Sequence, residues 1–536
     1  MKKKLYLLLS VLFVQLSLIA QTAPSTKPNI VVVLVDDMGF SDLSCYGGDI
    51  PTPNLDALAQ NGIRVKNFYN TARCCPSRAS ILTGLYPQQT GIGYMAGGKL
   101  GKVNPAYQGF LNNNCATMAQ LLKPQGYHTI MAGKWHIGHD EGMRPIDKGF
   151  DRSLNAKAGG FYFSEDEDNA KLFLDGKAIK NSEIENGNWY STDLWTKFTL
   201  GCIDQAKASN KPFFVYLAHN APHFPVQAPK EDIQKFIGKF SKGWEVLRKE
   251  KHERQIKMGL IKSTQKLPII NQLIPKWDTL SKEEKIRQDN IMAIYAATVS
   301  RLDKSIGDLV QGLKDKGVYE NTIIMFMSDN GGNAEGKAKG ITKGKDWGSA
   351  NSSVFISQGW AELSNTPYWL YKHNTSEGGI ASPFIASWPN GINKQLNGKI
   401  IEAPSHLIDI MPTCLELAGV TYPDQYNGNK LTPNPGKSLL PVFKGTTFAT
   451  DRPLFWEHEG NRAMRMGKWK IVSNVGENWQ LYNLDLDGSE TKDLAKSNSK
   501  MLKEMTSKYE VWFKSVNGGL YFKKPHEWQT LQTPQK

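Results

Sequence analysis

Two pairs of oxygen-bearing side chains directly follow apolar runs and could bind a hard metal cation. Asp36 and Asp37 end the run NIVVVLVDD, and Asp329 and Asn330 end the run TIIMFMSDN. Three carboxylates and one amide form an oxygen-only ligand set, which suits calcium or magnesium better than zinc. Asp and Asn are also common in the turns that follow strands. Two such pairs at equivalent strand ends nevertheless favour a metal site.

A second group of side chains is cationic or titratable and could hold an anion. Lys134 and His136 occupy alternate positions in GKWHIGH, so an extended backbone would place both on one face. The other members are Arg78, His223 in APHFP and Lys372 in YKHN. Each would be unremarkable alone. Together, three fixed cations and two imidazoles could surround a tetrahedral anion with charge-assisted donors.

The stretch TARCCPSRASILTG at residues 71–84 contains two adjacent cysteines, Cys74 and Cys75, at the predicted first turn of a helix. Neighbouring cysteines cannot readily form a disulfide without distorting the backbone. Cys74 could be a nucleophile whose pKa is lowered by a nearby cation, or it could be buried and inert. Neither alternative explains why Pro-Ser-Arg follows the pair.

Four apolar runs lead into polar or glycine-containing segments, at residues 28–38, 128–138, 211–223 and 321–332. Helical patterns lie between them, such as ATMAQLLKPQ at 116–125 and a longer pattern from the capping box of Ser281 and Glu284 towards Lys314. Strands that alternate with helices predict an α/β domain with a mostly parallel sheet. Ligands of such sheets bind at the carboxyl ends of the strands, where the acidic and basic groups fall.

The pattern changes near Arg452, where short alternating runs are followed by a helical stretch near Lys500. We therefore predict a large α/β domain over residues 25–445 and a smaller α+β subdomain over 446–536. Residues 228–280 are rich in Lys, Glu and Gln and lack clear periodicity. We expect this segment to be a surface insertion that covers or shapes the site.

Residues 1–20 have a short basic start and an apolar run, which is the layout of a secretory signal peptide. A membrane anchor is the alternative, but Gln15 and Ser17 interrupt the run. We predict an exported protein, periplasmic or secreted, without stable membrane insertion. The formal net charge of +14 favours anionic ligands, and Lys2, Lys3 and Lys4 would leave with the signal peptide. No zinc-finger spacing or other nucleic-acid-binding motif accompanies the charge, so we expect no nucleic acid partner.

The cysteines do not form the dense, regular pattern of a disulfide framework. Six of them are scattered along the chain, and their pairing cannot be read from their spacing: Cys45, Cys74, Cys75, Cys115, Cys202 and Cys414.

The Cys74 stretch resembles the signature of the type I, formylglycine-dependent sulfatases, Cys-x-Pro-Ser-Arg followed by a helix that ends in Leu-Thr-Gly. Other stretches resemble motifs of the same family: TPNLDALAQNGIRVKNFY at 52–69, VDDMG, GKWHIG, APHFP, SDNGG, the spacing from Lys372 to EGG, HLIDIMPTCLELAG at 406–419 and RMGKWKIV at 465–472. The resemblance is to bacterial arylsulfatase-like members and spans nearly the whole chain after the signal peptide. It implies the α/β fold of the alkaline phosphatase superfamily, with helices around a mostly parallel sheet and a smaller C-terminal domain. The catalytic domain would then be residues 25–445.

The same resemblance implies that a maturation enzyme oxidises Cys74, and not Cys75, to formylglycine. The hydrated aldehyde would attack sulfur at a helix start, where backbone N–H groups favour anions. Calcium, with magnesium as second choice, would be bound by residue 74 together with Asp36, Asp37, Asp329 and Asn330.

The remaining roles are also implied by the resemblance. Arg78 matches the residue that steadies the hydrated aldehyde, and Lys134 and Lys372 match those that bind the sulfate. His136 matches the base that removes a proton from the second hydroxyl group. His223 matches the acid that protonates the departing alcohol.

Three alternatives stay open. The chain could hydrolyse aryl or phenol sulfates, it could be a formylglycine-dependent phosphonate monoester or phosphodiester hydrolase, or it could be an inactive glycan-binding relative. We favour removal of terminal sulfate groups from a sulfated saccharide, because an exported enzyme meets polymer fragments. The loop 93–112 supplies side chains that would suit a sugar ring: Tyr94, Tyr107, Gln108, Phe110 and Asn112. The alternative is that Tyr107 and Phe110 simply pack under the loop.

Overall fold

The computed structural model describes residues 27–97, 104–166 and 170–516. The predicted signal peptide therefore lies outside the described residues. Within these three ranges, no helix has both the length and the apolar composition that a membrane-spanning segment needs.

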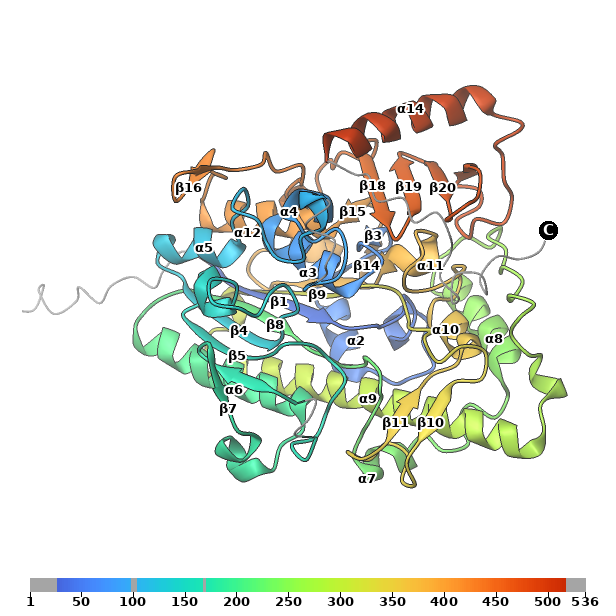
Figure 1. Ribbon diagram of the computed structural model, residues 1–536, viewed down its shortest axis with the longest axis horizontal. Coiled ribbons are helices and arrows are strands. Elements are labelled where there is room, and N and C mark those ends of the chain that lie inside the picture. The colour runs from blue at the N-terminus through green and yellow to red at the C-terminus, as the bar shows by residue number, and fades with distance from the viewer. Residues whose placement is uncertain (1–26, 98–103, 167–169, 517–536) are drawn as a thin grey trace, which may run out of the picture.

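The predicted parallel sheet is confirmed (Figure 1). Ten strands of the described chain form it, in the order β14-β2-β13-β9-β1-β8-β4-β5-β6-β7. The strands from β9 to β5 are parallel, and four of these five are the predicted apolar runs. The parallel strands are β9 (Thr322–Ser328), β1 (Asn29–Val35), β8 (Phe213–Ala218), β4 (His128–Lys134) and β5 (Arg152–Ala156). The outer strands are β14 (Lys399–Ile401), β2 (Ile63–Val65), β13 (Phe384–Ser387), β6 (Leu172–Leu174) and β7 (Lys177–Ile179).

Helices cover both faces of the sheet, which explains why β1 is apolar at every position after Asn29 (Figure 1). Val31, Val33 and Val35 belong to the core shared with α2 (Pro53–Gln60), α6 (Ser191–Ala208) and α9 (Lys282–Asp315). Ile30 and Leu34 belong to the opposite core, with α3 (Cys74–Thr83), α5 (Met118–Leu122) and α12 (Ile410–Ala418). The capping residue predicted for α9 is confirmed, since the Ser281 hydroxyl accepts from the Glu284 N–H.

The prediction of a surface insertion at residues 228–280 is only partly right, because the segment has many exposed residues but is also helical and partly buried. The segment forms α7 (Lys230–Gln234) and α8 (Trp244–Lys257), and Trp244 is buried against Trp277 and Trp360, with ring centroids 4.9 and 5.3 Å away. The helical period was hidden because the buried face of α8 also carries charged and amide side chains. Lys251, for example, is buried and donates to two backbone carbonyls.

The C-terminal part forms the predicted smaller α+β unit (Figure 1). Its antiparallel sheet consists of β18 (Pro453–His458), β19 (Asn461–Met466), β20 (Trp469–Ser473) and β21 (Gln480–Asn483). Helix α14 (Ser499–Ser515) covers one face, where Trp512 stacks on Phe455. The sheet is joined to the large domain, since the Trp456 indole donates to the Asn70 carbonyl at 2.7 Å. The boundary after residue 445 stays a prediction.

The remaining elements are short and connect these layers. The helices are α4 (Pro87–Thr90), α10 (Gln358–Ser364), α11 (Glu377–Ile380) and α13 (Leu440–Lys444). The strands are β3 (Phe68–Tyr69), β10 (Ile341–Lys343), β11 (Ser353–Phe355), β12 (Ala381–Ser382), β15 (Ser405–His406), β16 (Gln425–Tyr426) and β17 (Asn429–Lys430).

Candidate active site

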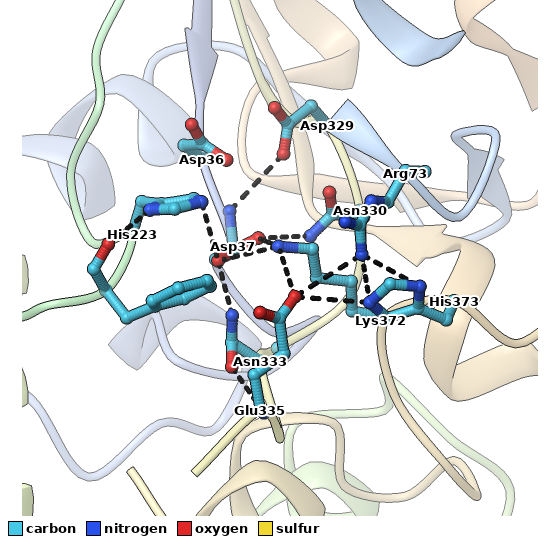
Figure 2. A network of polar contacts seen from close by, with 12 residues as sticks. Asp36, Asp37, Arg73, His223, Asp329, Asn330, Asn333, Glu335, Lys372 and His373 are labelled. Atoms are coloured by element: carbon cyan, nitrogen blue, oxygen red, sulfur yellow. Dashed lines mark hydrogen bonds and ion pairs between the residues drawn. The ribbon is translucent and has the colours of Figure 1, made fainter. Parts of the chain in front are cut away.

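The sheet brings the two predicted ligand pairs together. Strands β1 and β9 are parallel neighbours in which Val35 lies opposite Ser328, so both pairs emerge at the same edge. The Asp329 N–H donates to the Val35 carbonyl at 3.0 Å, and the Asp37 N–H donates to the Asp329 carboxylate at 3.3 Å. All four side chains are buried and gather in one place (Figure 2).

Two oxygen atoms of this group need a partner that the described protein does not supply. Asp36 Oδ1 and Asn330 Oδ1 are buried and accept no hydrogen bond from the described residues. The Asn330 amide nitrogen donates to Asp37 Oδ1 at 2.7 Å, which fixes the orientation of the amide. In that orientation the amide oxygen has no donor among the described residues. A buried acceptor without a donor is costly. The oxygen-only set therefore fits a hard divalent cation.

Arg78 connects the two acidic pairs from inside α3. Its guanidinium lies 2.8 Å from Asp329 Oδ2 and 3.2 Å from Asp36 Oδ2, and it also donates to the Lys134 carbonyl. Lys134 Nζ lies 2.5 Å from Asp36 Oδ2. Burial acts to raise the pKa of Asp36, but Lys134, His223 and Arg78 outweigh it and hold that pKa below its ordinary value. Burial, with Asp36 nearby, raises the pKa of Asp329 well above its ordinary value.

Lys372 approaches from the other side (Figure 2). Its ammonium group lies 2.8 Å from Asp37 Oδ1 and 3.3 Å from Glu335 Oε1. Burial would lower the pKa of Lys372, yet Asp37 and Glu335 outweigh it and raise that pKa. Asn333, which we did not predict as a site residue, donates to Asp37 Oδ2 at 2.7 Å. Its signal in the sequence was only its place just after SDNGG.

Cys74 is the first residue of α3 and is buried. The Ser77 hydroxyl one turn later donates to the Asp329 carbonyl at 2.5 Å, which fixes the helix start against the acidic group. A hydrogen bond from Cys75 holds the pKa of the Cys74 thiol well below its ordinary value despite burial, and Lys134 and His136 contribute. Cys74 therefore lies among cations at a helix N-terminus, a place suited to anions.

His136 reaches Cys74, but the reason we gave from the sequence is wrong. Strand β4 ends at Lys134, and His136 has a φ of 60°, so the two residues do not alternate along one strand. The imidazole nevertheless lies beside Cys74, because ligand atoms of Cys74, Cys75 and His136 lie within 4.8 Å of one another. Burial, together with Lys134 and Arg78, lowers the pKa of His136 to about 4. At neutral pH this ring is uncharged and can accept a proton.

His223 follows β8 and points its Nε2 atom at the acidic group (Figure 2). Nδ1 lies 2.5 Å from the Phe224 carbonyl, which can only accept, so Nδ1 carries a hydrogen. Nε2 lies 3.7 Å from Asp37 Oδ2. Burial and Lys134 lower the pKa of His223, while Asp37 acts in the opposite direction.

Two aromatic side chains of the loop 93–112, which we expected to suit a sugar ring, lie in different environments. Tyr107 is buried, and its hydroxyl donates to Glu457 Oε2 at 2.9 Å, so it packs under the loop as in the alternative interpretation. Phe110 is 37% exposed.

The sequence also gave no sign that the C-terminal β18–β19 hairpin reaches the site, where Glu459 contacts His373, the neighbour of Lys372. Among the described residues, all six cysteines are free thiols.

Comparison with known proteins identifies the arrangement. The family model for Sulfatase matches residues 28–420. The chain belongs to the sulfatase family. It is 34% identical to an uncharacterized sulfatase of Schizosaccharomyces pombe, over 91% of this chain and 94% of the relative. It is also 34% identical to an arylsulfatase of Klebsiella aerogenes, over 75% and 89%. The N-acetylgalactosamine-6-sulfatase of Rattus norvegicus is 29% identical over 88% of this sulfatase and 76% of its own length.

Solved structures agree with the family. The crystal structure of Ps i-CgsB superimposes with a TM-score of 0.69 at 26% identity, covering 95% of this sulfatase and all of that chain. The same protein has been solved in complex with k-i-k-neocarrahexaose. The predictions of a type I sulfatase, of its superfamily fold and of a sulfuric ester hydrolase are therefore confirmed. Sulfatases use a modified cysteine and a divalent cation.

Proposed function

We propose that this sulfatase releases sulfate from a sulfated saccharide, using formylglycine at position 74 and one bound calcium ion. The ligands would be residue 74 and the two acidic pairs: Asp36, Asp37, Asp329 and Asn330. The observation that carries the proposal is the pair of unpartnered, buried oxygens on Asp36 and Asn330, beside Cys74. Magnesium is the second choice, because the site is made of oxygens alone.

The chain's own groups would divide the chemistry between binding and proton transfer. When present, the cation supplies Lewis acidity and the hydrated aldehyde supplies the attacking hydroxyl. Lys134 and Lys372 would donate to sulfate oxygens, since both ammonium groups border the acidic group. Arg78 would hold residue 74 and the ligands in place from inside α3.

The two histidines would act on different protons. His136, uncharged at neutral pH and close to residue 74, would accept the proton of the second hydroxyl group. His223 would give a proton from Nε2 to the departing alcohol oxygen, because Nδ1 is engaged by the Phe224 carbonyl. Because the pKa of His223 is lowered, its ring tends to be neutral when no substrate is bound. A bound anionic sulfate ester would favour the imidazolium form, so His223 would take up its proton when the substrate binds.

Two similar proteins support a saccharide substrate: the rat N-acetylgalactosamine-6-sulfatase, and Ps i-CgsB, which has been solved in complex with k-i-k-neocarrahexaose. The arylsulfatase of Klebsiella aerogenes supports the alternative, an aryl or phenol sulfate. A formylglycine-dependent phosphonate or phosphodiester hydrolase and an inactive glycan-binding protein are the remaining alternatives. Export and processing by a maturation enzyme complete the proposal.

The experiment is to coexpress the chain with a sulfatase-maturation enzyme and to measure both modification and turnover. The mass of the peptide containing Cys74 should fall below that of the thiol form, and a hydrazide probe should label it. Cys75→Ala should still be converted, whereas Cys74→Ala should be inactive. Active protein that carries an unmodified Cys74 would refute the formylglycine proposal. Sulfate release from sulfated oligosaccharides, compared with nitrophenyl sulfate and phosphonate esters, distinguishes the substrate classes.

A further inference from the structure

A second polar network borders the sulfate site, on the side of Lys372 away from Asp36 (Figure 2). Glu335 Oε1 lies 3.3 Å from Lys372 Nζ, 3.3 Å from Arg73 Nη1 and 3.2 Å from His373 Nε2. Arg73 directly precedes Cys74, and His373 directly follows Lys372. The network is therefore covalently next to two residues of the proposed catalytic machinery, but it has no part in that chemistry.

The β18–β19 hairpin completes this network from the C-terminal domain. Glu459 Oε2 lies 3.0 Å from His373 Nδ1, and the Asn461 amide donates to the His373 carbonyl at 3.0 Å. Behind them, His458 Nε2 lies 3.6 Å from Glu459 Oε1. The His458 ring is buried, and neither of its nitrogens hydrogen-bonds with the described residues.

The backbone is held in an uncommon conformation at three of these positions. His373, Glu459 and Ala72 have φ values of 77°, 52° and 64°, and the His373 N–H donates to the Ala72 carbonyl at 2.9 Å. Glu459 and Gly460 form the two-residue turn between paired His458 and Asn461, a turn that favours Asn, Asp or Gly. Non-glycine residues with positive φ cluster at functional sites. A glutamate in this turn indicates that its carboxylate has a role, which here is the contact with His373.

The charges of the network's side chains and their exposure to solvent limit which ligands the network can bind. Only its outer members reach solvent: the Glu335 side chain is 29% exposed and that of Arg73 is 15% exposed, while Glu459 is 4% exposed. Despite burial, Lys372, His373 and Arg73 hold the pKa of Glu335 below its ordinary value, and His458, His373 and Arg73 do the same for Glu459. Glu335 pairs with Arg73 and Lys372, and Lys372 is also shared with Asp37. Both fixed cations of the network are therefore already paired with carboxylates among the described residues.

We propose that Glu335, Arg73 and His373 form a specificity subsite for the hydroxyl groups of a neutral sugar ring that carries the scissile sulfate. This inference rests on the proposed function and adds the class of sugar that the enzyme would accept, a neutral ring. The Glu335 carboxylate can accept a hydrogen bond from one sugar hydroxyl, and the Arg73 guanidinium can donate to the neighbouring hydroxyl. Glu459 and His458 are positioning residues that hold His373. A second sulfate or a uronic carboxylate at this position meets Glu335 and is disfavoured.

A metal site is the competing interpretation, because His373, His458 and Glu459 offer ligand atoms within 4.8 Å of one another. The Arg73 guanidinium lies within hydrogen-bond distance of both nitrogens of the His373 ring. Both ring nitrogens of His373 also have carboxylate neighbours, Glu335 and Glu459, so they are already engaged. The network therefore suits hydroxyl groups better than a metal.

The test uses matured full-length enzyme and three kinds of probe. The probes are nitrophenyl sulfate, the four galactose monosulfates with sulfate on O2, O3, O4 or O6, and the matching galactose disulfates. The variants are Glu335→Gln, Glu459→Gln and Glu459→Asp. Glu477→Gln is the matched control, because that glutamate lies in the connection between β20 and β21 of the same sheet and contacts Asn474.

The wild type should hydrolyse at least one galactose monosulfate with a kcat/KM at least tenfold above that for the matching disulfate. Glu335→Gln should lower kcat/KM on that sugar at least tenfold more than on nitrophenyl sulfate, mainly through KM, and should reduce the discrimination against the disulfate. Glu459→Gln should act in the same direction, and Glu459→Asp, which keeps the charge, should recover part of the loss. The control should match the wild type on every probe.

Two results would overturn the subsite while leaving the sulfatase proposal intact. One is a wild type that cleaves nitrophenyl sulfate but no galactose monosulfate, or that prefers the disulfates. The other is an equal loss on sugar and nitrophenyl sulfate in both Gln variants. A matured wild type that cleaves no sulfate ester would instead refute the proposed function, and the subsite with it.

Discussion

Replacing Arg78 by Met should destabilise the protein strongly when metal is absent. Arg78 is fully buried and interacts with Asp36, Asp329 and the Lys134 carbonyl. Methionine fills much of the same space but leaves two buried carboxylates and one carbonyl without this donor. Removing one partner of a buried ion pair costs about 3–5 kcal/mol, because the remaining charge stays buried and uncompensated.

That cost converts into a measurable shift of the melting temperature. Unfolding entropy is about 2 cal/mol/K per residue, which is roughly 1 kcal/mol/K for a chain of about 500 residues. A loss of 3–5 kcal/mol therefore predicts a melting temperature about 3–5 °C lower in EDTA. Adding calcium should recover part of the loss, because a bound cation compensates the same carboxylates. Adding Asp329→Asn to the Arg78→Met variant should also recover part, since one uncompensated charge disappears.

Scanning calorimetry in EDTA and in calcium measures these shifts, and Arg152→Met is the matched control. Arg152 pairs with Asp175 at 3.0 Å, but its side chain is 28% exposed, so its loss should cost less than about 1 kcal/mol. The reasoning fails if Arg78→Met melts within about 1 °C of the wild type in EDTA. It also fails if Asp329→Asn destabilises the Arg78→Met variant further.

Three other predictions concern stability, metal binding and proton donation. Burial raises the pKa of Glu457 from 4.5 to about 7, so the stability it contributes is complete below about pH 4.5 and is lost as the pH rises through 7. Glu457→Gln should therefore reduce the fall in unfolding free energy between pH 5 and 8 by about 2–3 kcal/mol, measured by urea unfolding; an unchanged slope would contradict this. Because the pKa of Asp329 is raised, protons should compete with calcium, and the calcium affinity measured by calorimetry should fall as the pH is lowered. Asp329→Asn should weaken binding and remove most of that dependence, and a wild-type affinity independent of pH would exclude the competition. His223→Ala should reduce kcat on sugar sulfates far more than on nitrophenyl sulfate, whose leaving group needs no proton; equal losses would argue against the acid role.

Much of the fold could be predicted because its determinants are local. The four buried parallel strands are continuous apolar runs, and the start of α9 is marked by Ser281. Helix α8 was missed because Arg248, Lys251 and Gln255 occupy its buried face. Some of their polar atoms bind distant groups: the Gln255 amide nitrogen, for example, donates to the Tyr46 and Thr366 carbonyls. The hydrophobic periodicity of a sequence does not reveal a buried helix face that carries polar side chains.

The sequence alone determined which residue types gather at the candidate active site, because strand ends and the Cys74 stretch place them where a parallel sheet collects ligands. It did not determine how the groups meet. His136 reaches residue 74 through a left-handed turn rather than by strand alternation. The network of Arg73, Glu335 and Glu459 joins residues hundreds of positions apart, from three separate segments. Such contacts depend on strand order and domain packing, which bring together residues that no local pattern connects, so only the tertiary structure decides them.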